Sequence, residues 1–139
     1  MNNLDKAIYS KLISNAHLVT LVGSTARIVR GLNLKDFSFV GTDKNALAFL
    51  EQIDNPETKY APIREVFYRL RSMSAVSDLK VQEIDSKVFD VLDDANLTTT
   101  DLWAYECKFE YGVLPASFDD ELQIWTKESR YRILATQRV

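Results

Sequence analysis

Histidine, cysteine, glycine and proline are all scarce in this chain of 139 residues, which contains one His, one Cys, four Gly and three Pro. A single cysteine excludes an intrachain disulfide framework and fits a reducing compartment. The few Gly and Pro leave little sequence for flexible linkers. No apolar run approaches the ~20 residues of a membrane span, and the N-terminus lacks the apolar segment of a signal peptide. We therefore expect a soluble domain made in a cytoplasm.

An excess of positive charge is also missing. The net charge is −3 and the isoelectric point is near 5.2, whereas nucleic-acid-binding domains are usually basic. Apolar residues make up 46% of the chain and charged residues 27%, which is typical of a globular protein. The length fits one domain, 1–139, with a single core.

The N-terminal third contains one clear periodic pattern. Leu4, Ile8 and Leu12 recur every four residues, which predicts a helix over about 3–16. Three charged residues are assigned to its solvated side: Asp5, Lys6 and Lys11. Residues 18–22 are interpreted as a short apolar turn, and residues 26–30 are too short to assign. Residues 31–45 are expected to form a long irregular loop.

The middle of the chain predicts two strands and a helix. Residues 46–53 indicate a strand, although their composition also allows a helix. Residues 63–73 indicate a second strand, because Val66, Tyr68 and Leu70 alternate with charged residues. A helix is predicted over 78–92, with Ser77 as its N-cap.

The last third predicts a long strand pair. Between 103 and 113 the odd positions are mostly aromatic and the even positions mostly charged, which indicates a strand with its odd side chains on the core. A loop is expected over 112–120. A fourth strand follows over 121–135, and its apolar parity changes between Trp125 and Arg130, which suggests a bulge or kink in that strand.

These elements follow in the order α-β-β-α-β-β. Consecutive strands joined by short turns pair antiparallel, and two helices can cover one face of the resulting sheet. The prediction is an α+β fold: an antiparallel four-stranded sheet with two helices packed on one face.

Residues that could carry chemistry have simpler structural explanations. His17 lacks partners at metal-ligand spacing and is expected just past the first helix, where the helix dipole favours a histidine. Cys107 lies on the apolar parity of its strand, where a buried thiol is inert. The acidic pairs at 93–94 and 119–121 fall in predicted turns. Because no P-loop or dinucleotide fingerprint is present either, we predict no catalytic, cofactor-binding or metal-binding residue, no cofactor, and no enzymatic activity.

Charged residues on the strands raise a different kind of function. If the second, third and fourth strands are neighbours, arginines and glutamates would share one sheet face. One interpretation is a solvated face with cross-strand ion pairs, and the other is a charged surface that selects a partner protein. The residues concerned are Arg64, Arg69, Arg71, Glu106, Glu110, Arg130 and Arg132.

Two phenylalanines in the irregular loop are the remaining candidates. Phe37 and Phe39 stand among polar residues, so they either pack onto the core or anchor an interface. Both interpretations remain open at the level of sequence.

The layout of the chain resembles the tail-completion proteins of long-tailed bacteriophages, also called tail terminators or head-to-tail joining proteins. The resemblance covers most of the chain. Its segments are the N-terminal helix from Leu4, the turn Leu21-Val-Gly23, the stretch 26–29, the strand 66–71, the helix 79–92 and the strand pair 103–113 and 124–134, which includes Lys127-Glu-Ser-Arg-Tyr-Arg132. The likeness is one of layout, with no catalytic motif to transfer, and the segment between Gly31 and Ala46 is longer than a minimal member needs.

The resemblance implies a structural virion protein. Such a subunit would assemble into a hexameric ring on the end of the tail tube and join the tail to the head connector, with DNA only passing through the lumen. Its partners would be its own copies, the tail tube protein and the connector or stopper protein, with no membrane involved. Its location would be the head–tail junction of the virion, after assembly in the host cytoplasm.

Two alternatives remain open from the sequence. The first is another neck component, such as a head-completion, connector or minor virion protein. The second is a small cytosolic ligand-binding or enzymatic α+β domain. A pocket with converging polar groups would favour the second, and a flat charged sheet face would favour a ring.

Overall fold

The computed structural model describes residues 3–31, 38–39, 41, 43–52, 64–100 and 102–137. Within these ranges the chain forms helices, one 3-10 turn and strands in the order α1 (Asn3–Ile13), α2 (Ala16–Val22), η1 (Thr25–Arg27), β1 (Ile28–Arg30), β2 (Asn45–Gln52), β3 (Arg64–Ser74), α3 (Asp78–Leu92), β4 (Leu102–Asp119) and β5 (Ile124–Gln137). None of the helices in the described ranges has the length and apolar character needed to span a membrane.

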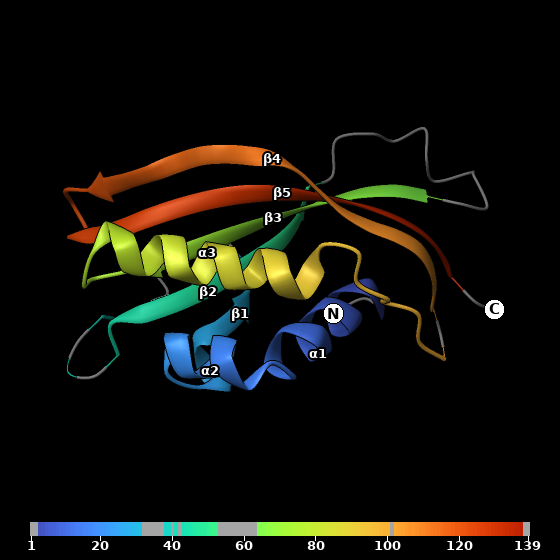
Figure 1. Cartoon of the computed structure of the whole chain (residues 1–139), viewed down its shortest axis with the longest axis horizontal. Helices are drawn as coiled ribbons and strands as arrows, with labels where there is room; N and C mark the ends of the chain where they lie inside the picture. Colours follow the sequence, from blue (N-terminus) through green and yellow to red (C-terminus); the bar gives the residue numbers. More distant parts are fainter. Residues whose placement is uncertain are drawn as a thin grey trace.

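The described strands form one sheet with the order β1-β2-β3-β5-β4. β1 pairs with β2 in parallel, and the other three pairs are antiparallel. The α-helices lie together on one face of this sheet (Figure 1). The predicted α+β class is therefore confirmed. The predicted four strands and two helices are corrected to five strands and three α-helices in the described part of the chain.

The additional elements, α2 and β1, are too short to show a period in the sequence. α2 has seven residues and begins where the Asn15 side chain accepts a hydrogen bond from the Leu18 N–H at 2.9 Å. It ends at Gly23, whose φ of 108° suits glycine. His17 therefore lies in the first turn of α2 and is exposed. The prediction that a helix dipole favours a histidine at this position is wrong, because the position is at the N-terminal end of a helix. β1 has three residues and is defined only by its pairing with β2.

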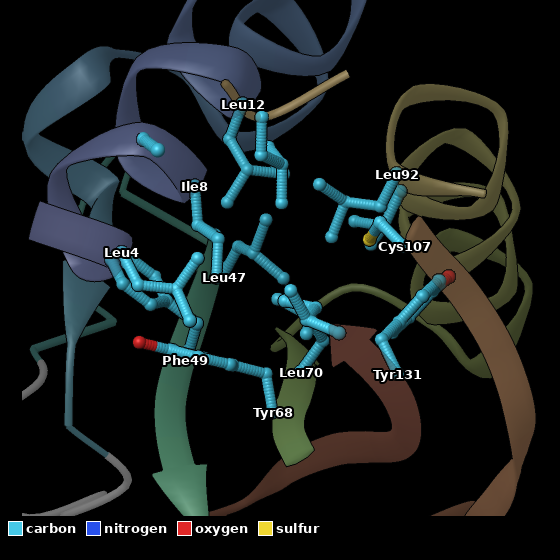
Figure 2. Close-up of a cluster of buried hydrophobic side chains, with 14 of the residues drawn as sticks. Leu4, Ile8, Leu12, Leu47, Phe49, Tyr68, Leu70, Leu92, Cys107 and Tyr131 are labelled. Atoms are coloured by element: carbon cyan, nitrogen blue, oxygen red, sulfur yellow. The ribbon is translucent and has the colours of Figure 1, made fainter. Parts of the chain in front are cut away.

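The main core lies between the helices and the sheet (Figure 2). Ile8 and Leu12 of α1 point from one side toward Leu47 and Phe49 of β2, and Tyr68 of β3 lies beside them. All five of these side chains are buried. Burial of one such side chain stabilises the fold by about 1.5–3 kcal/mol, so this layer supplies most of the favourable free energy of folding.

Two of the predicted elements agree closely with the structure. α3 begins at Asp78, and its N-cap Ser77 accepts a hydrogen bond from the Lys80 N–H at 3.2 Å. Its apolar face is buried as the helical spacing predicted. β3 spans Arg64–Ser74, and Val66, Tyr68 and Leu70 are buried on the helix side.

The predicted burial of the third strand is wrong for most of its residues. Among the odd positions of β4 only Cys107 is buried, whereas Trp103, Tyr105 and Tyr111 are 47%, 53% and 45% exposed. The register of β4 against β5 shifts at four places between Ala104 and Ser117. Each extra residue in a bulge reverses the face to which the following side chains point, so a regular alternation in sequence does not remain on one face. The predicted loop over 112–120 is likewise corrected, because β4 continues to Asp119.

β5 itself has no bulge in its pairing with β3, which runs without interruption from Ser74↔Trp125 to Arg64↔Ala135. Its change of parity has another cause, which is burial on both faces of the sheet. Ile124 belongs to a small apolar cluster with Ala46, Ala48 and Met73, separate from the main core. The early residues of β5 are buried on the face away from the helices, and Tyr131 and its odd-numbered neighbours are buried beneath the helices.

Asp5 was expected to be solvated but is fully buried at 0% exposure. Its carboxylate accepts a hydrogen bond from the Tyr68 hydroxyl at 2.5 Å and one from Arg30 Nε at 2.6 Å. These contacts join α1 to β3 and to the edge strand β1. A buried carboxylate is tolerated because both partners satisfy it.

Replacing Asp5 by alanine should lower the free energy of unfolding by about 2–4 kcal/mol, because the Tyr68 hydroxyl and the Arg30 guanidinium lose their shared acceptor. Urea unfolding followed by circular dichroism measures this. Asp120→Ala, at an exposed site in the turn before β5, is the control and should change stability by less than about 0.5 kcal/mol. Equal effects of the two substitutions would contradict a structural role for Asp5.

Cys107 is buried, as predicted. Burial raises the pKa of its thiol from 9.0 to about 12, and the nearby Asp93, Asp94 and Glu106 carboxylates add to the shift. Burial also raises the pKa of Tyr131, which lies on the neighbouring strand.

This shift predicts alkaline destabilisation. Between pH 9.0 and about 12 the native thiol keeps its proton while the unfolded thiol loses it. Stability attributable to Cys107 is therefore complete below pH 9 and falls by about 1.4 kcal/mol per pH unit above it. Unfolding free energies measured from pH 8 to 11 should fall less steeply for Cys107→Ala than for the unmodified chain. Parallel slopes would show that the thiol does not titrate differently in the two states.

Candidate interaction surface

Charged side chains of β3, β4 and β5 gather on the sheet face opposite the helices, and we call this surface the charged face. The pairing of β3 with β5 places Arg69 opposite Arg130, and Arg71 opposite Glu128. The pairing of β4 with β5 adds glutamates from the edge strand. The charged face consists of Arg69, Arg71, Arg130, Arg132, Glu65, Glu106, Glu110 and Glu128, four positive and four negative residues.

The centre of the charged face is a buried carboxylate between two arginines. Glu128 is 0% exposed, although the described helices lie on the other face of the sheet (Figure 1). Its carboxylate oxygens lie 2.6 Å from Arg69 Nε and 3.1 Å from Arg71 Nη2. The two arginine side chains, 31% and 18% exposed, cover it. One negative charge held by two positive charges in a partly dry site orients both guanidinium groups.

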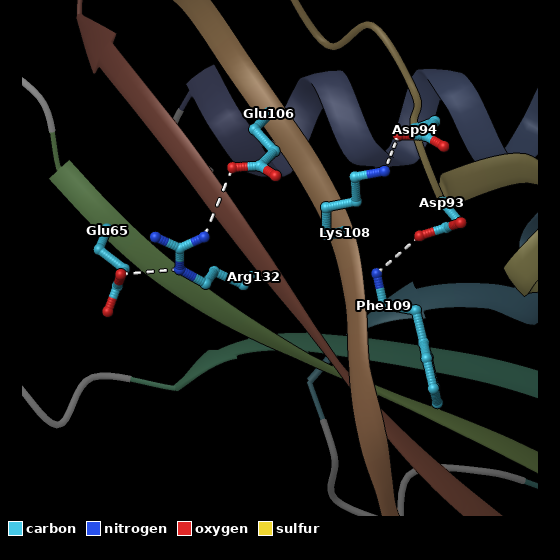
Figure 3. Close-up of polar contacts among 7 residues, drawn as sticks. All are labelled: Glu65, Asp93, Asp94, Glu106, Lys108, Phe109 and Arg132. Carbon is cyan, nitrogen blue, oxygen red and sulfur yellow. Dashed lines mark hydrogen bonds and ion pairs between the residues drawn. The ribbon is translucent and has the colours of Figure 1, made fainter.

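The other two arginines each join neighbouring strands. Arg132 of β5 contacts Glu65 of β3 at 2.7 Å and Glu106 of β4 at 3.4 Å (Figure 3). The strong hydrogen bond from Arg132 to Glu65 raises the pKa of the guanidinium further above its usual value. Pairs this exposed contribute at most about 1 kcal/mol each, so their main effect is to fix the arrangement of charge.

Arg130 is held by aromatic rings as well as by charge. Its guanidinium lies 3.7 Å from the centre of the Phe67 ring, and its Nη1 donates to the Tyr111 hydroxyl at 2.9 Å. Glu110 supplies the opposite charge at 3.3 Å. This combination of stacking and ion pairing is specific to arginine.

The structure thus brings together Arg69, Arg71, Arg130, Arg132, Glu106 and Glu110, as the sequence suggested. Their role in an interface stays a prediction. Arg64 lies apart, because its even position directs it to the helix side of β3, where it is 3.9 Å from Glu51 of β2. Phe37 lies outside the described residues. Phe39 is half-buried against the small apolar cluster, with the Arg27 guanidinium 5.2 Å from its ring centre.

A row of exposed aromatic side chains along β4 was not predicted from the sequence. Phe109 is 38% exposed and stacks edge-on against Phe89 of α3, with ring centres 5.5 Å apart. The ring centres of Trp103 and Tyr105 lie 6.3 Å apart at the start of the strand, and Tyr111 follows further along. We call these five residues the aromatic edge. The alternating aromatics were visible in the sequence, but the bulges that turn them outward were not.

Enzymatic chemistry finds little support in the described residues. No group of three or more His, Cys, Asp and Glu side chains is placed there to hold a metal ion. An open groove of about 660 Å³ between α2 and α3 is lined by exposed side chains, including His17, Glu83 and Asp90. Glu83 and Asp90 are each 58% exposed, so neither has the desolvated setting of a general acid or base.

The buried position of Glu128 leads to a stability prediction. Glu128→Gln keeps the volume but removes the charge that both arginines share, so the free energy of unfolding should fall by about 1–3 kcal/mol. Glu110→Gln on the same face is the matched control. Because Glu110 is 34% exposed, Glu110→Gln should lower the free energy of unfolding by less than about 1 kcal/mol. Urea denaturation of both variants measures the difference, and a cost for Glu110→Gln as large as that for Glu128→Gln would refute the central role of Glu128.

Comparisons with known proteins bear on the fold. No family model matches the sequence, and no curated protein matches it significantly. A chain from the virion of a native gene transfer agent (GTA) particle is similar in structure over 94% of this chain and 92% of its own, with a TM-score of 0.72 and 13% identity. The gp17 protein of bacteriophage SPP1 is similar over 94% of this chain and 86% of its own, with a TM-score of 0.52 and 14% identity. At these identities the chain shares a fold with a virion component and with a bacteriophage protein.

Proposed function

We propose that this chain is a structural subunit of a phage or phage-like virion, which forms a ring on the end of the tail tube and joins the tail to the head connector. The observation that carries the proposal is the structural likeness, over nearly the whole chain, to a component of a gene transfer agent virion. The resemblance of the sequence layout to phage tail-completion proteins favours the same kind of particle.

The surface properties of the chain support an assembling protein. The charged face carries equal numbers of arginines and glutamates in fixed pairs, which suits selection of a partner more than binding of phosphates. The net charge of −3 also suits a ring through which DNA passes, because an acidic subunit does not hold the phosphate backbone. The aromatic edge adds large exposed apolar side chains, which mark protein–protein contacts.

The proposal is tested by imaging the purified protein alone and mixed with tail tubes, using negative-stain electron microscopy and mass photometry. Rings of hexameric mass, either free or at tube ends, are the expected result. Subunits that bind heads or connectors but ignore tubes would favour the alternative of another neck component. A protein that stays monomeric and binds neither tubes nor heads would refute a role in the virion neck.

A further inference from the structure

The aromatic edge exposes a large share of the big hydrophobic side chains found on the surface of the described chain. Phe89, Trp103, Tyr105, Phe109 and Tyr111 are 38–53% exposed; the last four lie on β4, the last strand at one edge of the sheet, and Phe89 of α3 packs against Phe109. Clusters of this kind on a soluble domain mark contact sites, and Trp and Tyr are the residues most often found at the centre of interfaces.

The edge of β4 cannot simply accept another strand, because its first half is already capped. The Asp94 N–H donates to the Cys107 carbonyl at 2.8 Å, and the Phe109 N–H donates to the Asp93 carboxylate at 2.9 Å (Figure 3). Thr98 Oγ1 accepts from the Ala104 N–H and donates to the Ala104 carbonyl, both at 3.1 Å. Caps of this kind, together with bulges, protect an edge from strand addition. A partner must therefore dock on the side chains.

Negative charge slightly exceeds positive charge around the aromatic edge. The described residues of 90–111 include five carboxylates and one cation, Lys108. Adding Lys87, Arg130 and Arg132, which pair with some of these carboxylates, leaves one negative charge in excess. Carboxylates and aromatic ring faces both attract ammonium and guanidinium groups, so this surface fits a partner that presents lysine or arginine.

The chain itself carries a surface that presents lysine and arginine, and this surface lies on its N-terminal residues. Residues 3–31, which we call the N-terminal block, comprise α1, α2, η1 and β1. They hold four basic residues and one acidic residue, the buried Asp5. β1 is the sheet edge opposite β4, and the N-terminal block lies across the molecule from the β4–β5 hairpin (Figure 1). The basic residues are Lys6, Lys11, Arg27 and Arg30.

We propose that the aromatic edge of one subunit docks on the N-terminal block of a second copy of this chain. The contact joins two different patches, as a closed ring requires, and this inference rests on the ring-forming function proposed above. Opposite net charge orients the approaching copies, and the exposed aromatic rings supply the contact area.

Charge reversal on each side of the contact tests this pairing. One variant carries Lys6→Glu with Lys11→Glu, and the other carries Asp90→Lys with Asp94→Asn. Asparagine suits the positive φ of 62° at position 94, and the edge cap there uses the backbone N–H. Each variant alone should weaken self-association about tenfold or more in mass photometry, sedimentation equilibrium and ring formation on tubes. An equimolar mixture of the two should recover assembly, because each then meets a complementary surface.

Two further variants control for unfolding and for charge in general. Gln82→Lys with Glu83→Lys makes the same change of charge as the aromatic-edge variant, but about two turns earlier on α3 than Asp90, and should assemble like the unmodified chain. Tyr105→Ser removes a side chain that is 53% exposed at a bulge, so it should weaken assembly without changing the circular dichroism spectrum.

The outcomes separate this inference from the proposed function. Rings that form normally in both charge-reversal variants would overturn the pairing and leave the ring function intact. Loss of tube binding with unchanged self-association would also overturn it, because the occupant of the aromatic edge would then be the tube. If the unmodified chain self-associates through this contact but binds neither tubes nor heads, the pairing stands and the proposed function fails. An unmodified chain that never self-associates, free or on tubes, overturns the pairing.

Discussion

The antiparallel pairing of β3 with β5 is the constraint on which most of this structure depends. Its eleven residue pairs run without a shift, and β5 thereby lies between β3 and β4 instead of at an edge. This placement buries Tyr68 beside Tyr131 under the helices and, on the other face, sets Arg71 opposite Glu128. One register therefore determines both the core and the charged face, because side chains alternate between the two faces of a strand.

The two faces contribute different things. The helix side buries many large apolar residues, each contributing about 1.5–3 kcal/mol, and this decides whether the chain folds. Apart from those of the buried Glu128, the ion pairs of the charged face are partly exposed and are worth at most about 1 kcal/mol each, so they add little net stability. Their consequence is geometric, since shared carboxylates hold arginines of neighbouring strands in one arrangement. Such a surface is suited to selecting a partner.

Local signals in the sequence predicted the elements that are long and regular. α3, with Ser77 as its cap and a continuous apolar face, and β3, with Val66, Tyr68 and Leu70, both appeared where the pattern placed them. Most of the arginines and glutamates of β3, β4 and β5 share a face, as the sequence suggested, whereas Arg64 lies on the helix side. Elements defined by pairing or by fewer than two helical turns, β1 and α2, gave no periodic signal, so the sheet was predicted one strand too small.

The sequence alone determined the α+β class, the scarcity of catalytic groups and the set of charged residues available for a contact. Only the tertiary structure decided which side chains are exposed. Bulges in β4 turned Trp103, Tyr105 and Tyr111 outward, and contacts from Tyr68 and Arg30 drew Asp5 into the interior. The physical reason is the same in both cases. Burial depends on partners distant in the chain, and the period of a single segment carries no information about them.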